Sequence, residues 1–483
     1  KINDNEYSYL LSSLIESISF VSNTAGVYGA FLKHWDPRAS KPIIFKRVET
    51  KNSKYFNLKC HNEKVENIIE AVNCDVLYLD PPYTQNQYGT QYHLLETLVL
   101  NDNPSVSQIT GSRPTTPMRS DWSKMYKAHI LFDKVLSKTK AKYILFSYSP
   151  DGFMSKSFIE ASLKRYGKPE TYECKKISYN KYTNFKSRGG KEHFEYLFFI
   201  EKKDSPNIHY ESPLNYIGSK ARMVSEINKY LPREITTFID IFGGGFNVGI
   251  NSNAKHIIYN DINYFVKDLV ESFKINDTYQ FILYVKKIIE RFNLKKADAE
   301  SYLKVRNYYN SLPIEKRSPK LLYTVILYGF NQQIRFNGDH DFNNPVGMRW
   351  FNDKVLEKKI SFSKIIKEKN ITFKSIDYSD LIDEIGNDAF VYMDPPYRHT
   401  NGSYNDGKRG FNGWNLDDER KLFEFADLLN KKSINFMLSY ITEHRGKVNS
   451  ELKSWIKSNN YRLINVGAIP GIQRKEVLIL NYN

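Results

Sequence analysis

The chain has 483 residues, which is more than one hydrophobic core usually organises, so two domains are expected. Its formal net charge of +16 is spread along the sequence and suggests a surface for a polyanion such as nucleic acid, although an AT-rich coding bias would also enrich lysine. Cys60, Cys74 and Cys174 show no zinc-site or disulfide spacing and no apolar run could span a membrane, so a cytoplasmic protein without a metal site is expected.

Apolar runs typical of strands alternate with longer helical patterns along the whole chain. The runs are DVLYLD (75–80), AKYILFSYS (141–149), TTFIDIF (236–242), KHIIYND (255–261), AFVYMD (389–394) and INFMLSY (434–440). Such alternation predicts an α/β fold with a largely parallel sheet. The polar, proline-punctuated stretch 201–213 predicts a linker, so we expect domains at 1–207 and 208–483.

One tetrapeptide, Asp-Pro-Pro-Tyr, ends a short apolar strand in each half of the chain. The copies are Asp80, Pro81, Pro82 and Tyr83, and Asp394, Pro395, Pro396 and Tyr397. Each is followed by a helical pattern and by a strand that ends in Ser-Tyr, at 147–148 and 439–440. One copy alone could be an ordinary turn. Two copies in matching contexts indicate that the halves are diverged copies of one catalytic unit.

A glycine-rich turn precedes the second copy. The strand that begins at Phe238 runs through Asp240 and Phe242 into glycines 243–245, where missing Cβ atoms let backbone amides approach a ligand closely. The next strand carries Asp261 near its end, in position to bind a ribose diol. Nothing supplies the phosphate-binding lysine of a P-loop, although a glycine turn alone could serve any nucleotide.

The order of the motifs in the second half resembles a known family. NYIGSK, FIDIFGGG, NDIN, IRFNGDHDFNNPVG and DPPY begin at 215, 238, 260, 334 and 394. They follow one another as in the Dam-like DNA adenine-N6 methyltransferases, and the resemblance covers essentially 212–483. It implies a Rossmann-like methyltransferase sheet, S-adenosylmethionine as the methyl donor, and double-stranded DNA as the substrate.

The resemblance also implies roles for single residues. Tyr216 and Lys220 would line the cofactor pocket, the glycine turn would face its methionine part, and Asp261 would bind its ribose. Asp377 would read the adenine amine of the cofactor, although a surface aspartate at a strand end is the alternative. The expected cofactor-binding set is Tyr216, Lys220, Asp240, Phe242, Gly243, Gly244, Gly245, Asp261, Asp377 and Asp394.

The chemistry of an amine explains the second Asp-Pro-Pro-Tyr. The exocyclic amine of adenine is a poor nucleophile because its lone pair is delocalised into the ring. A site that accepts one N–H on the Asp394 carboxylate and the other on the Pro395 carbonyl frees that lone pair. Two prolines fix the turn, and the Tyr397 ring could stack on a base turned out of the helix.

The long segment between the second and third strands of this half, about 264–370, is where the Dam-like family holds its target-recognition region. Arginine suits guanine or phosphate, and asparagine suits adenine. Any single candidate could equally be structural or a phosphate contact. The expected DNA-binding residues are Arg335, Asn337, Asn343, Asn344 and Arg349.

The first half resembles the later portion of another adenine methyltransferase. It has NTAGVYGAFLKHW (23–35), DPPYTQNQYG (80–89) and the aromatic, basic tract YNKYTNFKSR (179–188), which could grip nucleic acid or form a solvated hairpin. Neither a GSK-like segment nor a glycine turn precedes Asp80. We therefore expect a partial methyltransferase domain, either degenerate or truncated upstream, and the first residue, Lys1, favours truncation.

Two such units in one chain resemble the FokI-type modification methylases of restriction systems. An asymmetric DNA site presents different sequences on its two strands, so two recognition units are needed to mark both adenines. A cognate restriction endonuclease would then act in the same system without a stable complex. The alternatives are RNA adenine methylation and, for the first half, a non-catalytic role in DNA binding.

Overall fold

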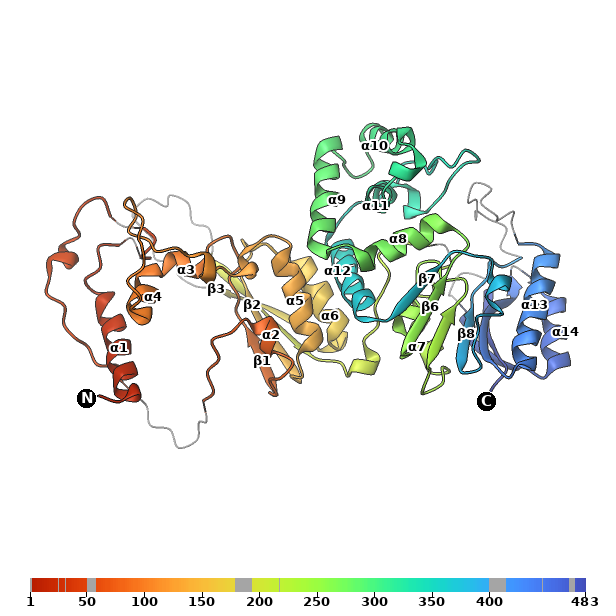
Figure 1. The fold of residues 1–483 in the computed structure, drawn as a ribbon, viewed down its shortest axis with the longest axis horizontal. Coiled ribbons are helices and arrows are strands. Elements are labelled where there is room, and N and C mark those ends of the chain that lie inside the picture. Colours follow the sequence, from red (N-terminus) through yellow and green to blue (C-terminus); the bar gives the residue numbers. More distant parts are fainter. Residues whose placement is uncertain are drawn as a thin grey trace. The chain divides into compact units, whose positions relative to one another are not determined.

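A computed structural model shows two compact units, 1–156 with 170–202 and 157–169 with 203–483. The described residues are 2–24, 26–30, 32–49, 58–178, 193–216, 218–398, 414–444, 446–468 and 474–483. The aromatic, basic tract at 179–188 therefore lies outside the described residues. Figure 1 labels the elements, and each unit is described by itself.

The second unit is built on one sheet with the strand order β11-β12-β9-β8-β5-β6-β7, and a short strand, β10, pairs with β9. β9, β8, β5, β6 and β7 pair in parallel, whereas β12 is antiparallel to β9 and β11 is antiparallel to β12. The strands are β5 (Thr237–Asp240), β6 (His256–Asn260), β7 (Ile371–Lys374), β8 (Ala389–Met393), β9 (Asn435–His444), β10 (Lys447–Val448), β11 (Arg462–Ala468) and β12 (Arg474–Leu480).

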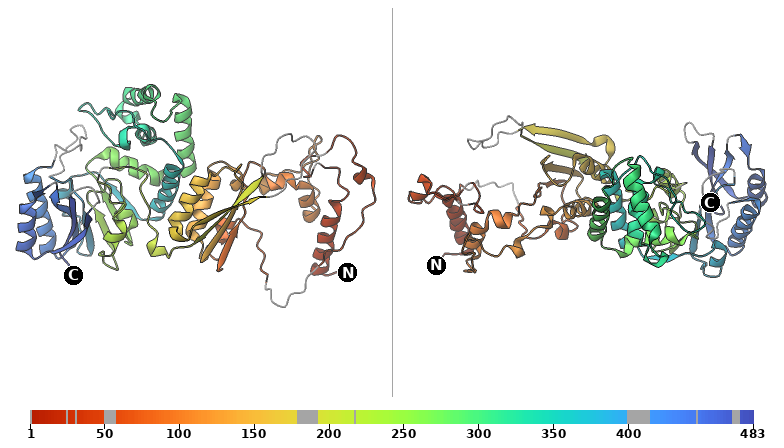
Figure 2. Two further views of the ribbon diagram at one scale, coloured as in Figure 1. Left: turned by 180° about the vertical axis from the view of Figure 1, so that it is seen from behind. Right: turned by 90° about the horizontal axis from the view of Figure 1, so that it is seen from above.

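Helices pack against this sheet. α13 and α14 cover one face through an apolar core that joins Leu422 and Ala426 of α13 to Val391 of β8 and Leu438 of β9 (Figures 1 and 2). Every residue of β8 is buried, as expected of a central parallel strand covered on both faces. The helices of this unit are α6 (Lys156–Tyr166), α7 (Val224–Asn228), α8 (Tyr264–Ile275), α9 (Thr278–Phe292), α10 (Ala299–Ser311), α11 (Pro319–Tyr328), α12 (Asp353–Glu368), α13 (Leu416–Lys431) and α14 (Ser450–Asn459).

The chain between β6 and β7 forms a helical insert, α8 to α12. α9, α10 and α11 pack on one another, and α8 and α12 connect them to the sheet (Figure 1). α11 is buried from Leu321 to Tyr328, so the insert has its own apolar core. The loop after α11 carries the segment 334–347, whose Phe336 and Phe342 side chains are buried.

The first unit has a smaller sheet with the order β1-β2-β4-β3. β1 and β2 are parallel, and the other pairs are antiparallel. The elements are α1 (Asp4–Ile18), α2 (Val65–Ile68), β1 (Val76–Leu79), α3 (Tyr88–Gln91), α4 (His93–Leu100), α5 (Lys127–Lys138), β2 (Tyr143–Tyr148), β3 (Glu173–Ser178) and β4 (Phe194–Glu201). The predicted α/β class is confirmed, but the prediction of a largely parallel sheet is wrong for this unit, since β4 runs antiparallel to both β2 and β3.

The two sheets share a strand order. β1-β2-β4-β3 in the first unit corresponds to β8-β9-β12-β11 in the second, with the same parallel and antiparallel pairs. The outer edge is the difference. β8 also pairs with β5, whereas in the described part of the first unit no strand pairs with the outer edge of β1. Val76 and Tyr78 of β1 are accordingly 47% and 57% exposed.

A buried ion pair fixes α6 to α12 inside the second unit. The Arg165 guanidinium binds both carboxylate oxygens of Glu357, and the side chains are only 9% and 4% exposed. Arg165 also donates to the carbonyl of His209 at 3.0 Å. Since buried charges are stable only when paired, the removal of one partner leaves the other desolvated and uncompensated.

We predict that Arg165→Ala destabilises the second unit by about 3–5 kcal/mol, because Glu357 would remain buried without its partner. The measurement is calorimetric unfolding, in which the transition of the second unit should move to lower temperature. Glu160→Ala is the matched control, because its pair with Lys164 on the same helix is 37% and 39% exposed. Equal shifts in the two variants would contradict the prediction.

Candidate active site

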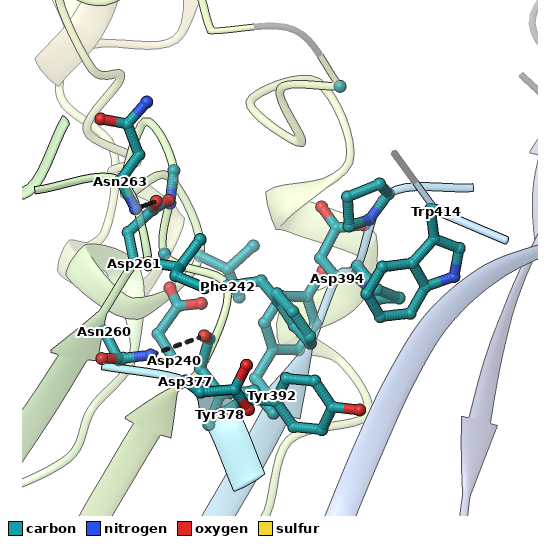
Figure 3. Close-up of a pocket in the computed structure, with 18 of the residues that line it drawn as sticks. Asp240, Phe242, Asn260, Asp261, Asn263, Asp377, Tyr378, Tyr392, Asp394 and Trp414 are labelled. Atoms are coloured by element: carbon teal, nitrogen blue, oxygen red, sulfur yellow. Dashed lines mark hydrogen bonds between the residues drawn. The ribbon is translucent and has the colours of Figure 1, made fainter. Parts of the chain in front are cut away.

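A cavity of about 730 Å³ opens at the carboxyl ends of β5, β6 and β8 in the second unit. Its walls come from the turn after β5, the end of β6, the loops after β7 and β8, and the first turns of α13 (Figure 3). Ligands of open α/β sheets occupy this edge. Of the residues predicted to bind cofactor, Tyr216, Lys220, Asp240, Phe242, Gly243, Gly244, Gly245, Asp261, Asp377 and Asp394 all line this cavity.

Close packing explains the glycine turn. A Cβ on Gly243 would lie 2.3 Å from the Tyr259 ring, and one on Gly244 would lie 2.9 Å from the Tyr216 ring. Gly244 also has a φ of +46°, which favours glycine. The two tyrosine rings therefore leave no room for side chains at these positions, and the glycine backbone lines the cavity.

Asp261 and its neighbours tie three loops together. The Gly244 amide donates to Oδ2 of Asp261 at 2.9 Å, and the Asn263 amide donates to Oδ1 at 2.9 Å. The Asn260 side chain donates to the carbonyls of Ile241 and Ile376 at 3.2 and 3.0 Å. Figure 3 shows Asp261 held at the cavity wall beside Asn260 and Asn263. The carboxylate is thus oriented before any ligand binds.

Asp240 is an acid buried against the cavity. It is 2% exposed and accepts the Gly249 amide at 3.2 Å. Burial, helped by the negative charges of Asp394 and Asp261, raises its pKa to about 8. A neutral buried acid of this kind ionises readily when a cation enters the site.

A buried lysine organises the Asp-Pro-Pro-Tyr turn after β8. The Lys220 ammonium lies 2.8 Å from Oδ1 of Asp394 and 2.8 Å from the Tyr397 hydroxyl, which itself donates to Oδ1 at 2.9 Å. Burial alone would lower the pKa of Lys220, but the charges of Asp394, Tyr397 and Glu476 outweigh it and raise that pKa. Lys220, predicted as a cofactor residue, thus contacts the catalytic turn directly.

The Tyr397 ring is largely covered. It is 7% exposed and packs edge-on against the Tyr440 ring, with the centroids 5.1 Å apart. Pro395 and Pro396 line the cavity beside it. The predicted stacking of Tyr397 on a base could therefore involve only the part of the ring that faces the cavity.

Sequence reasoning missed an aromatic wall, formed by Phe242, Tyr378 and Trp414. The centroid of Phe242 lies 5.2 Å from that of Tyr378 and 5.9 Å from that of Trp414. Asp377 is exposed beside this wall and accepts the amide and hydroxyl of Ser379 at 2.9 and 2.6 Å. Phe242 stood next to the glycine turn and Tyr378 next to the predicted Asp377, but no sequence pattern indicated that the Tyr378 and Trp414 rings would meet that of Phe242.

The first Asp-Pro-Pro-Tyr lies in the other unit and does not line this cavity. Its Tyr83 hydroxyl donates to Glu195 at 3.0 Å, and the Ser147 hydroxyl donates to the same carboxylate at 3.3 Å. Partial burial and the negative charge of Glu195 raise the pKa of Asp80. Pro81 and Pro82 are half-buried. The first copy is therefore an acidic cluster, whereas the second is centred on a lysine.

The predicted DNA-binding residues fall into two groups. Arg335 and Arg349 are exposed on the insert. Asn344 is 1% exposed, and its amide donates to the carbonyls of Phe330 and Gln333 at 2.9 and 3.1 Å. Direct contact of Asn344 with DNA is therefore at odds with the structure, because both of its N–H groups hold the loop.

Two further asparagines are half-buried in the same segment. The Asn337 side chain accepts the amides of Asp339 and Asp341 at 3.0 and 2.9 Å, which closes the turn. The Asn343 amide donates to the carbonyl of Arg335 at 3.0 Å. Asn337 thus shapes the loop through its side chain and Asn343 through its backbone.

The described residues contain no cluster of three or more His, Cys, Asp or Glu side chains suitable for a metal ion. Among the same residues, no helix has the length and apolar character needed to cross a membrane.

The chain has extensive sequence similarity to known proteins. The family described as D12 class N6 adenine-specific DNA methyltransferase matches residues 1–150 and 216–472. The sequence is 38% identical to type II methyltransferase M.FokI of Planomicrobium okeanokoites, over 100% of this chain and 78% of the relative. It is 35% identical to modification methylase StsI of Streptococcus sanguinis, over 95% and 73% of the two chains.

A further relative, modification methylase LlaI of Lactococcus lactis subsp. lactis, is 34% identical over 100% of this chain and 77% of its own length. These matches confirm the resemblance that the motifs indicated, and the alternative of RNA methylation finds no support in a DNA-directed family. The cavity with its glycine turn and its Asp-Pro-Pro-Tyr is found in the half that the family match covers from residue 216. The chain is a member of the D12 class of N6 adenine-specific DNA methyltransferases.

Proposed function

We propose that residues 208–483 form the catalytic domain that transfers the methyl group of S-adenosylmethionine to adenine N6 in a specific sequence of duplex DNA, with Asp394 at the reacting amine. The observation that carries the proposal is one cavity lined by both the glycine turn and the Asp394 to Tyr397 turn. The order of the parallel strands around β5 and β8 supports a Rossmann-like sheet. The cytoplasm is the expected location, since the DNA to be marked lies there.

The pocket residues fit S-adenosylmethionine, which supplies a methyl group on a positively charged sulfur. Asp394 gives the cavity a negative charge that suits a cation, and Asp240 adds a second one when it ionises as a cation binds. Asp261 is oriented by two backbone amides and offers carboxylate lone pairs to ribose hydroxyls. The aromatic wall suits the face of a purine. The cavity volume, about 730 Å³, lies within the range typical of small-ligand sites.

Asp394 is suited to activate a weakly nucleophilic amine. Its Oδ1 atom is held by Lys220 and Tyr397, and within the described part of the chain no hydrogen bond occupies Oδ2. One amine N–H would bind to Oδ2 and the other to the carbonyl of Pro395, which frees the nitrogen lone pair. Oδ2 can then take the proton that the methylated amine releases. Positioning and electrostatics supply the acceleration, without a covalent enzyme intermediate.

The first half, 1–207, is proposed as a partial methyltransferase domain. The shared strand order supports common descent with the second half. In the second unit β5 pairs with β8 at the edge that corresponds to the uncovered edge of β1. A counterpart of β5 would pair there, and the described part of the first unit has no such strand. With its cofactor-binding strands present, this half would mark the second adenine of an asymmetric site; without them its role would be non-catalytic DNA binding.

A restriction system is the setting that fits this organisation. The relatives are named as type II or modification methylases. We extend that role to this chain, which would protect an asymmetric DNA site from a cognate endonuclease. Marking DNA and cutting it are separate encounters with the same sequence, so no stable complex between the two enzymes is required.

The first prediction concerns methyl transfer. The chain should transfer labelled methyl from S-adenosylmethionine to unmethylated duplex DNA, and Asp394→Ala should abolish the transfer because the amine loses its acceptor. Asp80→Ala should leave the activity unchanged if the first half makes no transfer. Identification of N6-methyladenine in the product supports the proposal, whereas activity on RNA alone or loss with Asp80→Ala would overturn it.

The second prediction concerns pH and Asp240. Without cofactor, the folded protein keeps the Asp240 proton up to about pH 8, whereas the unfolded chain loses it near the ordinary aspartate pKa of 3.8. Its contribution to stability is therefore full below pH 3.8 and is lost as the pH rises to about 8. Asp240→Asn should raise the unfolding temperature at pH 9 relative to the wild type, and little at pH 4.

The same residue should link cofactor binding to proton release. A cationic ligand favours ionised Asp240, so binding of S-adenosylmethionine at pH 7 should release protons from the wild type and fewer from Asp240→Asn. Calorimetric titrations in two buffers of different ionisation enthalpy measure this difference. Equal proton release by both proteins would show that another group is responsible.

The third prediction separates DNA contact from loop structure. Arg349→Ala should weaken DNA binding and reduce the slope of log K against log salt by about 0.9, the value for one lost phosphate contact. Asn344→Ala should instead lower the unfolding temperature, because the loop at Phe330 loses its buried hydrogen bonds. An unchanged salt slope in Arg349→Ala would place that arginine off the DNA.

A further inference from the structure

A buried glutamate lies on β12, the strand that follows β9 in the sheet order. Glu476 of β12 is 4% exposed and pairs across the sheet with Ile441, the residue that follows Tyr440. The register of β12 against β9 shifts between Lys475 and Glu476. Such irregularities re-aim side chains next to active sites.

The first unit has a glutamate at the same place in its sheet. There Tyr148, which ends the corresponding Ser-Tyr strand, pairs with Tyr196 of β4, and Glu195 directly precedes Tyr196. In the second unit Tyr440 pairs with Val477 of β12, and Glu476 directly precedes Val477. Glu195 binds the hydroxyl of Tyr83, the tyrosine of the first Asp-Pro-Pro-Tyr. The position is thus occupied by an acid beside both copies of the turn.

The lysine distinguishes the two sites. In the second unit, the three N–H groups of Lys220 are directed to Asp394, Tyr397 and the carbonyl of Gly218, at 2.8, 2.8 and 3.2 Å. Glu476 therefore acts on the ammonium through its charge, which contributes to the raised pKa of Lys220. No lysine approaches Tyr83 in the described part of the first unit.

We propose that Glu476 is a positioning residue for methyl transfer, whose negative charge balances Lys220 so that Asp394 stays a strong acceptor for the adenine amine. A lysine paired with Asp394 alone would neutralise the carboxylate and weaken its hold on an N–H. With Glu476 the cluster keeps a net negative charge, and the acceptor strength of Oδ2 follows that charge. This inference rests on the proposed role of Asp394.

The first unit shows the opposite imbalance. Glu195 faces Asp80 without an intervening lysine among the described residues, and its charge, added to partial burial, raises the pKa of Asp80. In the second unit the positive charge of Lys220, which is paired with Asp394, offsets the negative charge of Glu476.

The expected effects of charge changes have opposite signs. The titratable groups that interact electrostatically around Asp394 include Lys220, Tyr397, Glu476, Asp240 and Tyr392. Glu476→Gln removes a negative charge from the cluster, so the acid limb of the pH profile of kcat should move to lower pH. Lys220→Met removes a positive charge, so that limb should move to higher pH.

The rates test the proposal. Glu476→Gln should lower kcat about tenfold with unchanged KM for DNA, since only the acceptor strength changes. Lys220→Met should lower kcat further, and the double variant should be faster than Lys220→Met alone, because Asp394 is no longer repelled by an unbalanced glutamate. Glu476→Asp keeps the charge and should retain most of the rate.

The control is Glu451→Gln, which removes an exposed charge on α14 that pairs with Arg420 at 3.2 Å and should leave all parameters unchanged. Circular dichroism and calorimetric binding of S-adenosylmethionine verify that each variant is folded. Wild-type kcat and pH profile in Glu476→Gln, equal losses in the Gln and Asp variants, or a double variant no faster than Lys220→Met would each overturn the inference. Absence of N6-methyladenine with the wild type would instead refute the proposed function.

Discussion

The burial of one ammonium group constrains the whole second unit. Lys220 is 4% exposed, and a charge so far from water is stable only with several partners. Its hydrogen bond to Tyr397 joins residues 177 positions apart in the sequence. This contact brings the segment that follows Leu214, whose Tyr216 ring packs on the glycine turn, against the turn after β8. The segment that packs on the glycine turn is therefore joined to the Asp-Pro-Pro-Tyr turn through Lys220, which contacts both Asp394 and Tyr397.

The sheet of the first unit corresponds to only part of the sheet of the second unit. Both have the strand that ends in Asp-Pro-Pro-Tyr, the parallel strand beside it and the antiparallel pair with its glutamate. Only the second has β5, β6 and β7, which supply the glycine turn and Asp261. The strand order positions the Asp-Pro-Pro-Tyr turn in both units. The positive charge beside the second turn comes from Lys220, which precedes the strands of its sheet in sequence.

Local signals predicted the centre of the site, and long-range contacts decided the rest. The glycine turn and both Asp-Pro-Pro-Tyr segments could be found because their chemistry lies in consecutive residues. Trp414 and Tyr378 were missed because only the folded chain brings them to Phe242. Asn344 was predicted to contact DNA, but its amide is used by carbonyls that no sequence pattern locates. Glu476 and Glu195 are acids at matching places in the last strands of the two halves. This correspondence could be recognised only once the strand registers were known.

The helical insert between β6 and β7 and the Lys220–Asp394 pair are linked through one segment of chain, which begins at Asn215. Asn331 and Gln332 both have positive φ, at 49° and 56°, and the loop is held in this strained form by Asn344. The carbonyl of Asn331 accepts the Asn215 amide at 2.6 Å. Asn215 begins the segment that ends at Lys220, so the segment is anchored to the insert at one end and to Asp394 at the other. The Asn215 hydrogen bond therefore links the insert to the segment that carries Lys220.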